Sequence, residues 1–522
     1  MVQSNTREAA SSLKERIKSG SAKELSPQEK AKIGLIGFKG IDRGRITRLA
    51  DKYGISRTTV YSYSDRMAWC IHREFNSSNA QEQSADMRER AIRHLLQLRL
   101  ECGVSLSSIS YMLKEGGYKQ DSPGFISQIV KEVGGKLSNT VNFEGESHFA
   151  SDEIYRLNNA PIYITVDPVS CAVLKMELRD STTKQGWTDH WQGMFDNNIS
   201  AKSLISDAGI ALKAAATALE GVVHQPDTFH GFIYDLGGTY GHLQRAAHGG
   251  IETEYKLEGM LKDMLAKQSN PDRILQLTER IAKNKVETRQ AIEAYDNFRF
   301  LHRCILTQLN VFDRNGEPRN RSKAEGEVRT AVELLQTMNI PILDKKLSSM
   351  LKIIPRVFAF LDNAAQYCKK MLDQELVQLH NIAFWCRAWH YLKKSFKIKN
   401  DYKCEQKYKH QSQSLLDIIQ QDLQLSDQDF DDLKMKIFTI LDGIVQSSAA
   451  VEMFNSILRP YLNTSRGQIT QEMLNLVMHH YNHRPFLRGK RKLKSPYELL
   501  TGIKPEQPWI DSLMDLVRLH QI

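Results

Sequence analysis

Cysteine is scarce in this sequence of 522 residues, and long apolar runs are absent. The seven cysteines are widely scattered and form no Cys-x-x-Cys pair. We therefore expect reduced thiols inside a cell rather than a disulfide framework. No stretch approaches the roughly 18 consecutive apolar residues of a membrane-spanning helix, so we expect no membrane association. The first twenty residues have no apolar segment typical of a secretory signal, and we expect a cytoplasmic protein.

Acidic residues are fewer than basic ones. Lys and Arg number 71 against 61 Asp and Glu, which gives a formal net charge of +10. This excess favours a polyanionic partner, most simply nucleic acid, although it also serves solubility. The length corresponds to about three or four domains of ordinary size, each able to bury a core without disulfide or metal cross-links.

Small helices separated by polar turns are expected in the N-terminal region. Ser26-Pro27-Gln28-Glu29 is a capping box that predicts the start of a helix. Residues 45–67 then show an apolar helical face, a turn glycine at Gly54 and an N-cap serine at Ser56. This is the pattern of a DNA-binding helix-turn-helix, although a plain helical hairpin is the alternative. The expected DNA contacts of its second helix are Arg57, Thr58, Thr59 and Tyr61.

A second helical unit follows the first. Three helices are expected over residues 85–102, 105–114 and 122–135, the last one capped by Ser122-Pro123. The turn between the last two is long, so a second helix-turn-helix and a dimerisation hairpin explain the pattern about equally well.

The periodicity changes to that of a sheet near residue 145. Three β-rich runs, a helix, a strand, a helix and a further strand follow one another, which predicts a mixed sheet covered by helices. These elements are expected at 148–155, 161–168, 171–178, 183–197, 202–209, 210–220 and 221–224. From 236 to 440 the apolar residues recur with helical spacing, which predicts an all-helical insertion of about 200 residues.

Several carboxylates fall near the expected strand ends. Phosphodiester chemistry with two divalent ions needs carboxylate oxygens that converge from different elements onto ions about 4 Å apart. Asp152 or Asp167 near the early strands, Asp207 at the end of a later strand, and Glu452 in the late segment SSAAVEMFNSILRPYL can supply them.

These segments resemble a known family. The ordered Asp, Asp and Glu, the phrases SDAGIALKAA, PDTFH and VEMFNSILRPYL, and the tail YNHRPFLRGKRKLKSPYELLTG look like the DDE transposases of bacterial insertion sequences and retroviral-type integrases. The resemblance covers roughly 146–235 and 441–500, and it implies an RNase H-like catalytic core. The long gap between Asp207 and Glu452 departs from a compact integrase, but helical insertions before the last catalytic helix occur in several transposase families.

The expected fold is therefore multidomain. An N-terminal all-α helix-turn-helix region precedes an RNase H-like α/β core with a mixed sheet, and a large all-α insertion interrupts that core. The expected parts are a helix-turn-helix domain at 1–84, a second helical domain at 85–144, the first part of the core at 145–235, the insertion at 236–440, the last core helices with the catalytic Glu at 441–484, and a basic C-terminal segment at 485–522.

The first acid is chosen by counting strands. An RNase H-like layout puts this acid on the first strand, with two more strands and a helix before the strand of the second acid. Asp152 satisfies this count, whereas Asp167 leaves one strand and is expected in a turn before Pro168. We expect Asp152 beside Asp207, with a raised pKa on one of the two. Glu153 should point to the opposite face of the strand.

Other candidates have structural alternatives. His230 resembles a histidine near the active site of related transposases and could contact the scissile phosphate or assist proton transfer; a structural role is equally compatible, and Asp227 is a weaker candidate. His380, Cys386 and His390 lie within eleven residues, but no fourth ligand is apparent, so core packing is preferred over structural zinc. Trp385 and Trp389 are also expected in the core.

The segment RPFLRGKRKLK contains six basic residues and no acidic one. We expect it to follow the phosphate backbone of DNA, which would make binding salt-dependent. A solvated loop or, in a eukaryote, a nuclear-import signal is the alternative. The basic residues are Arg484, Arg488, Lys490, Arg491, Lys492 and Lys494, and further expected DNA contacts are Asn455 and Arg459 on the helical face of Glu452.

The resemblance implies a transposase that binds transposon ends and performs strand cleavage and strand transfer. Asp152, Asp207 and Glu452 would bind two Mg²⁺ ions, for which Mn²⁺ would substitute. The expected partners are double-stranded DNA, as transposon ends and target, and further copies of the chain in a dimer or larger oligomer. In a bacterium the protein would be associated with the nucleoid. A catalytically silent, transposase-derived DNA-binding protein and a hydrolytic nuclease of the same fold are the alternatives.

Overall fold

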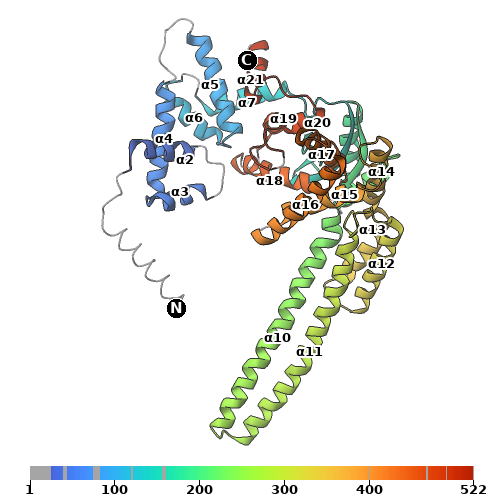
Figure 1. The fold of residues 1–522 in the computed structure, drawn as a ribbon. Coiled ribbons are helices and arrows are strands. Elements are labelled where there is room, and N and C mark those ends of the chain that lie inside the picture. The colour runs from blue at the N-terminus through green and yellow to red at the C-terminus, as the bar shows by residue number, and fades with distance from the viewer. Residues whose placement is uncertain are drawn as a thin grey trace. The chain divides into compact units, whose positions relative to one another are not determined.

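The computed structural model of the chain is mostly helical, with one five-stranded mixed sheet (Figure 1). The described residues are 25–38, 44–74, 83–118, 121–155, 160–207, 209–398, 400–465, 468–489 and 491–520. Two compact units are present, one formed by Met1–Asn139, Arg156–Asn159 and Ser456–Ile522 and the other by Thr140–Tyr155 and Ala160–Asn455. None of the helices in the described ranges combines the length and the apolar character needed to cross a bilayer.

The first unit begins with the three helices α2 (Pro27–Phe38), α3 (Arg45–Tyr53) and α4 (Arg57–Glu74). The capping box is confirmed, since the Glu29 backbone N–H donates to Ser26 Oγ at 3.2 Å and the Ser26 N–H donates to Glu29 Oε2 at 2.9 Å. Gly54 ends α3 with a φ of 66°, a left-handed conformation that favours glycine. Ser56 Oγ accepts the Thr59 N–H at 3.0 Å and caps α4 as expected.

Two glycines of α2 allow α4 to pack closely against it. A Cβ atom on Gly34 would collide with the Tyr63 carbonyl oxygen, and one on Gly37 would collide with Ser64 Oγ. Ile33 is fully buried beside these glycines and packs in one cluster with Val60. The approach of the two helices therefore depends on the missing side chains.

The second helical unit contains α5 (Gln83–Leu100), α6 (Leu106–Glu115) and α7 (Pro123–Gly135), close to the expected bounds. The C-terminal helices α19 (Gln471–His483), α20 (Pro496–Thr501) and α21 (Trp509–Leu519) belong to the same compact unit. Asn475 Nδ2 donates to the carbonyl oxygens of Gly134 at 3.1 Å and Leu137 at 2.8 Å. Trp509 Nε1 donates to Glu101 Oε1 at 3.1 Å. The end of the chain thus packs with helices near its beginning.

The second unit is built around the sheet, whose strand order is β3-β2-β1-β4-β5. Its strands are β1 (Gly145–Tyr155), β2 (Pro161–Val166), β3 (Val173–Leu178), β4 (Ile199–Ser206) and β5 (Val223–Pro226). β1 pairs antiparallel with β2, and β2 pairs antiparallel with β3, whereas β4 runs parallel to both β1 and β5. The expected succession of strands and helices is confirmed, with the last strand two residues later than predicted.

Helices from different parts of the unit contact the two faces of the sheet. On one face α8 (Lys184–Phe195) packs by its aromatic side chains, since the Trp187 ring stacks on Tyr163 at 4.1 Å and Trp191 Nε1 donates to Ser151 Oγ at 3.2 Å. α9 (Ile210–Ala218) follows β4. His148 of β1 faces the opposite way, because successive side chains of a strand alternate, and its Nε2 lies 3.5 Å from the Tyr367 hydroxyl.

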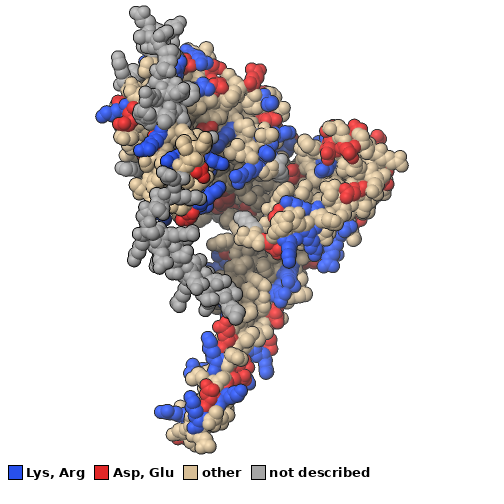
Figure 2. Space-filling model, turned by 60° about the vertical axis from the view of Figure 1, so that its left-hand side comes forward, with Lys and Arg blue, Asp and Glu red and all other residues tan. Residues whose placement is uncertain are grey.

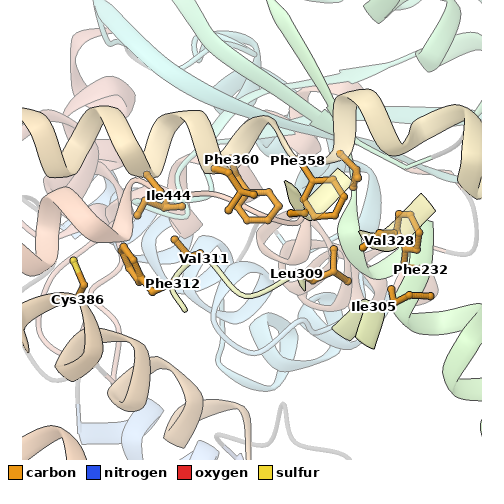
Figure 3. Close-up of a cluster of buried hydrophobic side chains, with 14 of the residues drawn as sticks. Phe232, Ile305, Leu309, Val311, Phe312, Val328, Phe358, Phe360, Cys386 and Ile444 are labelled. Carbon is orange, nitrogen blue, oxygen red and sulfur yellow. The ribbon is translucent and has the colours of Figure 1, made fainter. Parts of the chain in front are cut away.

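The described residues of the insertion form helices joined by loops, as predicted, with an isolated bridge between Phe312 and Pro318 in one loop. A single π-helical turn, η1 (Phe229–Ile233), leads from β5 into α10 (Tyr234–Ala266). The remaining helices are α11 (Pro271–Gln308), α12 (Arg321–Thr337), α13 (Asp344–Val357), α14 (Ala359–Asp373), α15 (Ile382–Lys397), α16 (Tyr402–Leu423) and α17 (Asp427–Asp442), followed by α18 (Ala449–Thr464). Figure 3 shows part of its apolar core, where Phe232, Ile305, Val328 and Phe360 come from four different elements.

Helices α10 and α11 form a long antiparallel pair within this unit (Figure 1). The 33 residues of α10 correspond to about 50 Å of helix. Charged side chains of both signs lie along the pair (Figure 2), and Lys285 Nζ lies 2.6 Å from Glu258 Oε1 across it. Near the α10–α11 turn, Leu257, Leu277 and Ile281 form a small apolar cluster separate from the main core.

The close contact of α2 with α4 gives a testable prediction. Gly34→Ala should destabilise these helices by about 1–3 kcal/mol, because the added methyl group meets backbone that cannot yield cheaply. Gly124→Ala in α7 is the control, since its Cβ would meet nothing closer than 3.9 Å. Amide hydrogen exchange should report faster exchange in α2 and α4 for the first variant alone. Equal protection in both variants would contradict the close contact.

Candidate active site

Asp152 and Asp207 each come directly after the last pair of residues that joins the neighbouring parallel strands β1 and β4. Ser151 of β1 is paired in register with Ser206 of β4. Asp152 follows Ser151, and Asp207 follows Ser206. Neighbouring strands of a sheet lie about 4.8 Å apart. The expectation that these two acids lie side by side is therefore confirmed by the register.

The Asp207 side chain is oriented by the turn that follows its strand. Gly209 donates its backbone N–H to Asp207 Oδ1 at 2.9 Å and is the N-cap residue of α9. A Cβ atom on Gly209 would lie 3.1 Å from that same oxygen, which is tighter than ordinary contact. The Asp-x-Gly sequence of residues 207–209 therefore forms a turn, and this turn fixes the position of a site carboxylate.

Negative charge accumulates around Asp152. Burial, together with the nearby charges of Asp207, Glu452 and Glu153, raises the pKa of Asp152 to about 7. The raised pKa expected for one member of the aspartate pair is thus found on Asp152. Asn455 Nδ2 donates to Asp152 Oδ2 at 2.8 Å. Asn455, expected to contact DNA, is instead buried and positions this carboxylate.

Glu452 reaches the site from the first turn of α18. Its side chain is 51% exposed, and its Oε1 lies 3.5 Å from His230 Nε2. His230 stands in the π-helical turn η1, a type of local distortion that is frequent at functional sites. The structure therefore brings together Asp152, Asp207, Glu452 and His230 from four separate elements.

Asp227 connects the elements that carry His230 and Glu452. The Asp227 carboxylate is buried; its Oδ1 accepts the Phe229 N–H at 2.5 Å, and its Oδ2 accepts the N–H of Ser448 at 2.6 Å and its hydroxyl at 2.5 Å. Ser448 immediately precedes α18. Sequence reasoning gave Asp227 little weight, because nothing near it in the chain shows that its partner is Ser448.

Glu153 points to the other face of β1, as alternation requires, but it is not isolated from the acids. Its Oε1 lies 3.6 Å from where a Gly209 Cβ would stand, and the Tyr155 hydroxyl donates to it at 3.4 Å. Burial raises the pKa of Glu153, and the charge of Asp207 adds to this effect. Glu153 was expected only on the opposite face of the strand. It nevertheless lies close enough to Asp207 for their charges to interact, because Asp207 stands just beyond the end of β4.

Asp167 lies in the β2–β3 turn, as expected from the strand count. Its Oδ2 accepts the N–H of Ser170 at 2.7 Å and the Ser170 hydroxyl at 2.6 Å. One carboxylate oxygen of Asp167 is thus held by the turn, and Asp152, not Asp167, is the early aspartate beside Asp207.

The alternative zinc site of His380, Cys386 and His390 is not formed. Cys386 is buried with its Sγ 3.8 Å from Cys368 Sγ, whereas His380 Nε2 contacts Asp422 Oδ2 at 2.7 Å on the surface. Trp385 and Trp389 are buried in the insertion core, as expected. Across the described ranges, no three His, Cys, Asp or Glu side chains stand ready at metal-binding spacing.

The expected DNA contacts differ in accessibility. Tyr61 is 55% exposed, whereas Thr59 is half-buried, with its Oγ1 2.8 Å from Ser56 Oγ. Arg484 NH2 lies 3.4 Å from Glu101 Oε2, and Arg491 is half-buried. Lys490 lies outside the described residues. The fully exposed members are Arg57, Thr58, Arg459, Arg488, Lys492 and Lys494.

Comparison with known proteins adds no relative to this picture. No family model matches the chain, and neither the curated proteins nor the solved structures contain a significant match to it. The geometry of the site therefore carries the functional argument by itself.

The raised pKa of Asp152 predicts a pH-dependent stability. Because its folded-state pKa of about 7 lies above the ordinary value of 3.8, the unfolded chain loses this proton first and folding stability falls as the pH rises between those values. Asp152→Asn removes this penalty and retains an acceptor for Asn455. Urea denaturation with a chelator present should show the variant more stable than wild type by up to about 4 kcal/mol near pH 8, and by less near pH 5.

Asp263→Asn is the control, because it changes an exposed carboxylate on α10. It should give the same stability difference from wild type at both pH values. A stability difference for Asp152→Asn that does not grow between the two pH values would contradict the proposed accumulation of charge.

Proposed function

We propose that the protein is a DDE-type DNA transposase that cleaves DNA strands at transposon ends and transfers them to a target. The observation that carries this proposal is the convergence of Asp152, Asp207 and Glu452. Two acids directly follow the last paired residues of the neighbouring parallel strands β1 and β4, and the charge of the third acts on the buried Asp152 carboxylate. Such uncompensated carboxylates are costly, so their accumulation points to a divalent cation as the missing partner.

An RNase H-like core is supported by the order of the elements. The first acid stands on β1, and two antiparallel strands and α8 precede β4, which ends at the second acid. β1 and β4 are neighbours in the sheet, as this layout requires. The third acid follows a helical insertion of more than 200 residues, which the resemblance to transposases accommodates.

DNA as the substrate is supported by features outside the acids. The chain has a net charge of +10, and Arg57 and Tyr61 are exposed at the beginning of the second helix of a helix-turn-helix pattern. The basic loop around Gly489 exposes Arg488, Lys492 and Lys494, which suits contact with backbone phosphates. Specific end recognition is therefore assigned to the helix-turn-helix and backbone affinity to the loop.

The donor set fits magnesium. Carboxylate and amide oxygens are the ligands that Mg²⁺ prefers, and two buried oxygens near the acids, Asn455 Oδ1 and Glu153 Oε2, have no hydrogen-bond partner among the described residues. Asp152, Asp207 and Glu452 would hold the ions. When bound, Mg²⁺ polarises the phosphodiester and makes water or a DNA 3′-hydroxyl an effective nucleophile at neutral pH.

The chain's own residues organise the acids for this chemistry. Asn455 fixes one Asp152 oxygen, and Gly209 fixes one Asp207 oxygen, so each aspartate retains a second oxygen for a ligand. His230 holds a nitrogen close to Glu452 and can orient this exposed carboxylate. Rigid support on strand ends and helix starts keeps the oxygens in place during the reaction.

The central prediction concerns two of the acids. Asp207→Asn and Glu452→Gln should each abolish Mg²⁺-dependent cleavage, with a loss of at least about 10³-fold, because they remove ligand charge at the reacting phosphate. DNA binding should survive in both variants. The measurement is single-turnover cleavage of a duplex carrying the element's own end, together with fluorescence anisotropy for binding.

Asp167→Asn is the matched control for the early strands. It should retain cleavage, since Asp167 is committed to Ser170 in the β2–β3 turn. Full activity of the Asp207 or Glu452 variant would refute the active-site assignment. Hydrolysis without strand transfer would support the nuclease alternative, and binding without any cleavage by wild type would support the silent DNA-binding protein.

Sequence recognition is predicted to depend on the start of α4. Arg57→Ala should weaken binding to the preferred duplex by about 1–3 kcal/mol while binding to other sequences changes little. Arg66→Ala is the control, because it removes the same charge from an exposed position later in α4. Duplexes enriched from a random pool by wild type would supply the preferred sequence. An unchanged sequence preference in the Arg57 variant would show that α4 does not recognise the DNA sequence.

A further inference from the structure

A small cavity adjoins Asp207 and His230, and Asp152 is not among its lining residues. Its volume is about 40 Å³, room for about three groups of the size of a water molecule. Its charged and titratable lining residues are Asp207, Asp227, His230, Lys213 of α9, His224 of β5 and Arg356 of α13. The cavity therefore joins two of the proposed site residues to basic side chains from three other elements.

Arg356 is contributed by the helical insertion, more than 120 residues after β5. It is the penultimate residue of α13, and its neighbours Ile354 and Val357 are buried in the insertion core. Ile353 on the same helix packs so closely against η1 that a Cβ on Gly231 would lie 2.8 Å from its Cδ1. This packing fixes the end of α13 against the turn that carries His230.

Both cations of the cavity lack a carboxylate partner. Within the described ranges neither Lys213 nor Arg356 takes part in an ion pair, and the Arg356 side chain contacts His224 Nδ1 at 3.4 Å. Since arginine only donates, His224 accepts this bond and donates from Nε2 to Ser206 Oγ at 2.9 Å. Burial lowers the pKa of His224 to about 4, and the charges of Arg356 and Lys213 contribute. The cations of the lining therefore face two carboxylates, Asp207 and Asp227, and the Asp227 carboxylate already accepts hydrogen bonds from Phe229 and Ser448.

We propose that Arg356 and Lys213 form a phosphate-binding site that holds a DNA backbone phosphate beside Asp207. This inference rests on the proposed function and assigns the insertion a direct part in it. An arginine fork matches two phosphate oxygens, and unpaired cations facing a cavity are the complement of an anion. The acids would lie on one side of the phosphate and the cations on the other. Arg356 thereby acts as a binding residue that the insertion supplies to the core.

The experiment compares Arg356→Gln, Arg356→Lys and Lys352→Gln in the full chain. Lys352 is the matched control, because it is an exposed cation one turn earlier on α13 and does not line the cavity. Single-turnover cleavage should fall about 100-fold in Arg356→Gln, by less in Arg356→Lys, and not in the control. The affinity of Arg356→Gln for duplex DNA, measured with Ca²⁺ in place of Mg²⁺, should also fall. The slope of its log affinity against log salt concentration should be smaller by about one.

Inorganic phosphate provides a test that needs no cleavage. It should raise the melting temperature of wild type and of Lys352→Gln, but not that of Arg356→Gln. If wild type cuts no DNA while this phosphate effect still depends on Arg356, the proposed function fails and the phosphate site stands. If Arg356→Gln matches Lys352→Gln in the phosphate effect and in DNA affinity, the phosphate site is refuted whether or not wild type cleaves.

Discussion

The carboxylate of Asp227 is the interaction on which the candidate site depends. It binds the start of η1 through Phe229 and the residue before α18 through Ser448, 221 positions later in the chain. Backbone carbonyls beside Ser448 reinforce the junction by accepting bonds from Gln225 and Thr228. Because His230 and Glu452 follow directly from these two segments, one buried carboxylate sets the position of both relative to the sheet.

The cluster of acids opposes folding, and other parts of the same unit compensate for it. A buried carboxylate surrounded by like charges is unfavourable when it is ionised, as the raised pKa of Asp152 indicates. The aromatic layer between α8 and the sheet and the apolar core of the insertion supply the opposing burial energy. The insertion is therefore part of the structure that makes this cluster of carboxylates possible, besides placing Arg356 beside Asp207.

Much of the fold and half of the site could be predicted from local patterns. Caps, turn glycines and strand alternation are local signals, and they placed α4 and β1. The choice of Asp152 over Asp167 came from the order of the strands, compared with an RNase H-like layout. Asn455, Asp227 and Arg356 could not be assigned in this way. Their partners lie far along the chain, 303 residues away for Asn455 and Asp152, so no window of sequence contains both members of a contact. Glu153 was misjudged because alternation gives the face of a strand but not the proximity of a turn beyond its end.

The α10–α11 pair has a property that the rest of the insertion lacks. Its outer part is held by its own small cluster of Leu257, Leu277 and Ile281, and none of these residues belongs to the main apolar core. Each helical turn adds about 5.4 Å of length. A paired turn added to or removed from both helices would therefore leave the main core packed as it is, so the two helices form a spacer whose length can change in fixed steps without moving the carboxylate cluster.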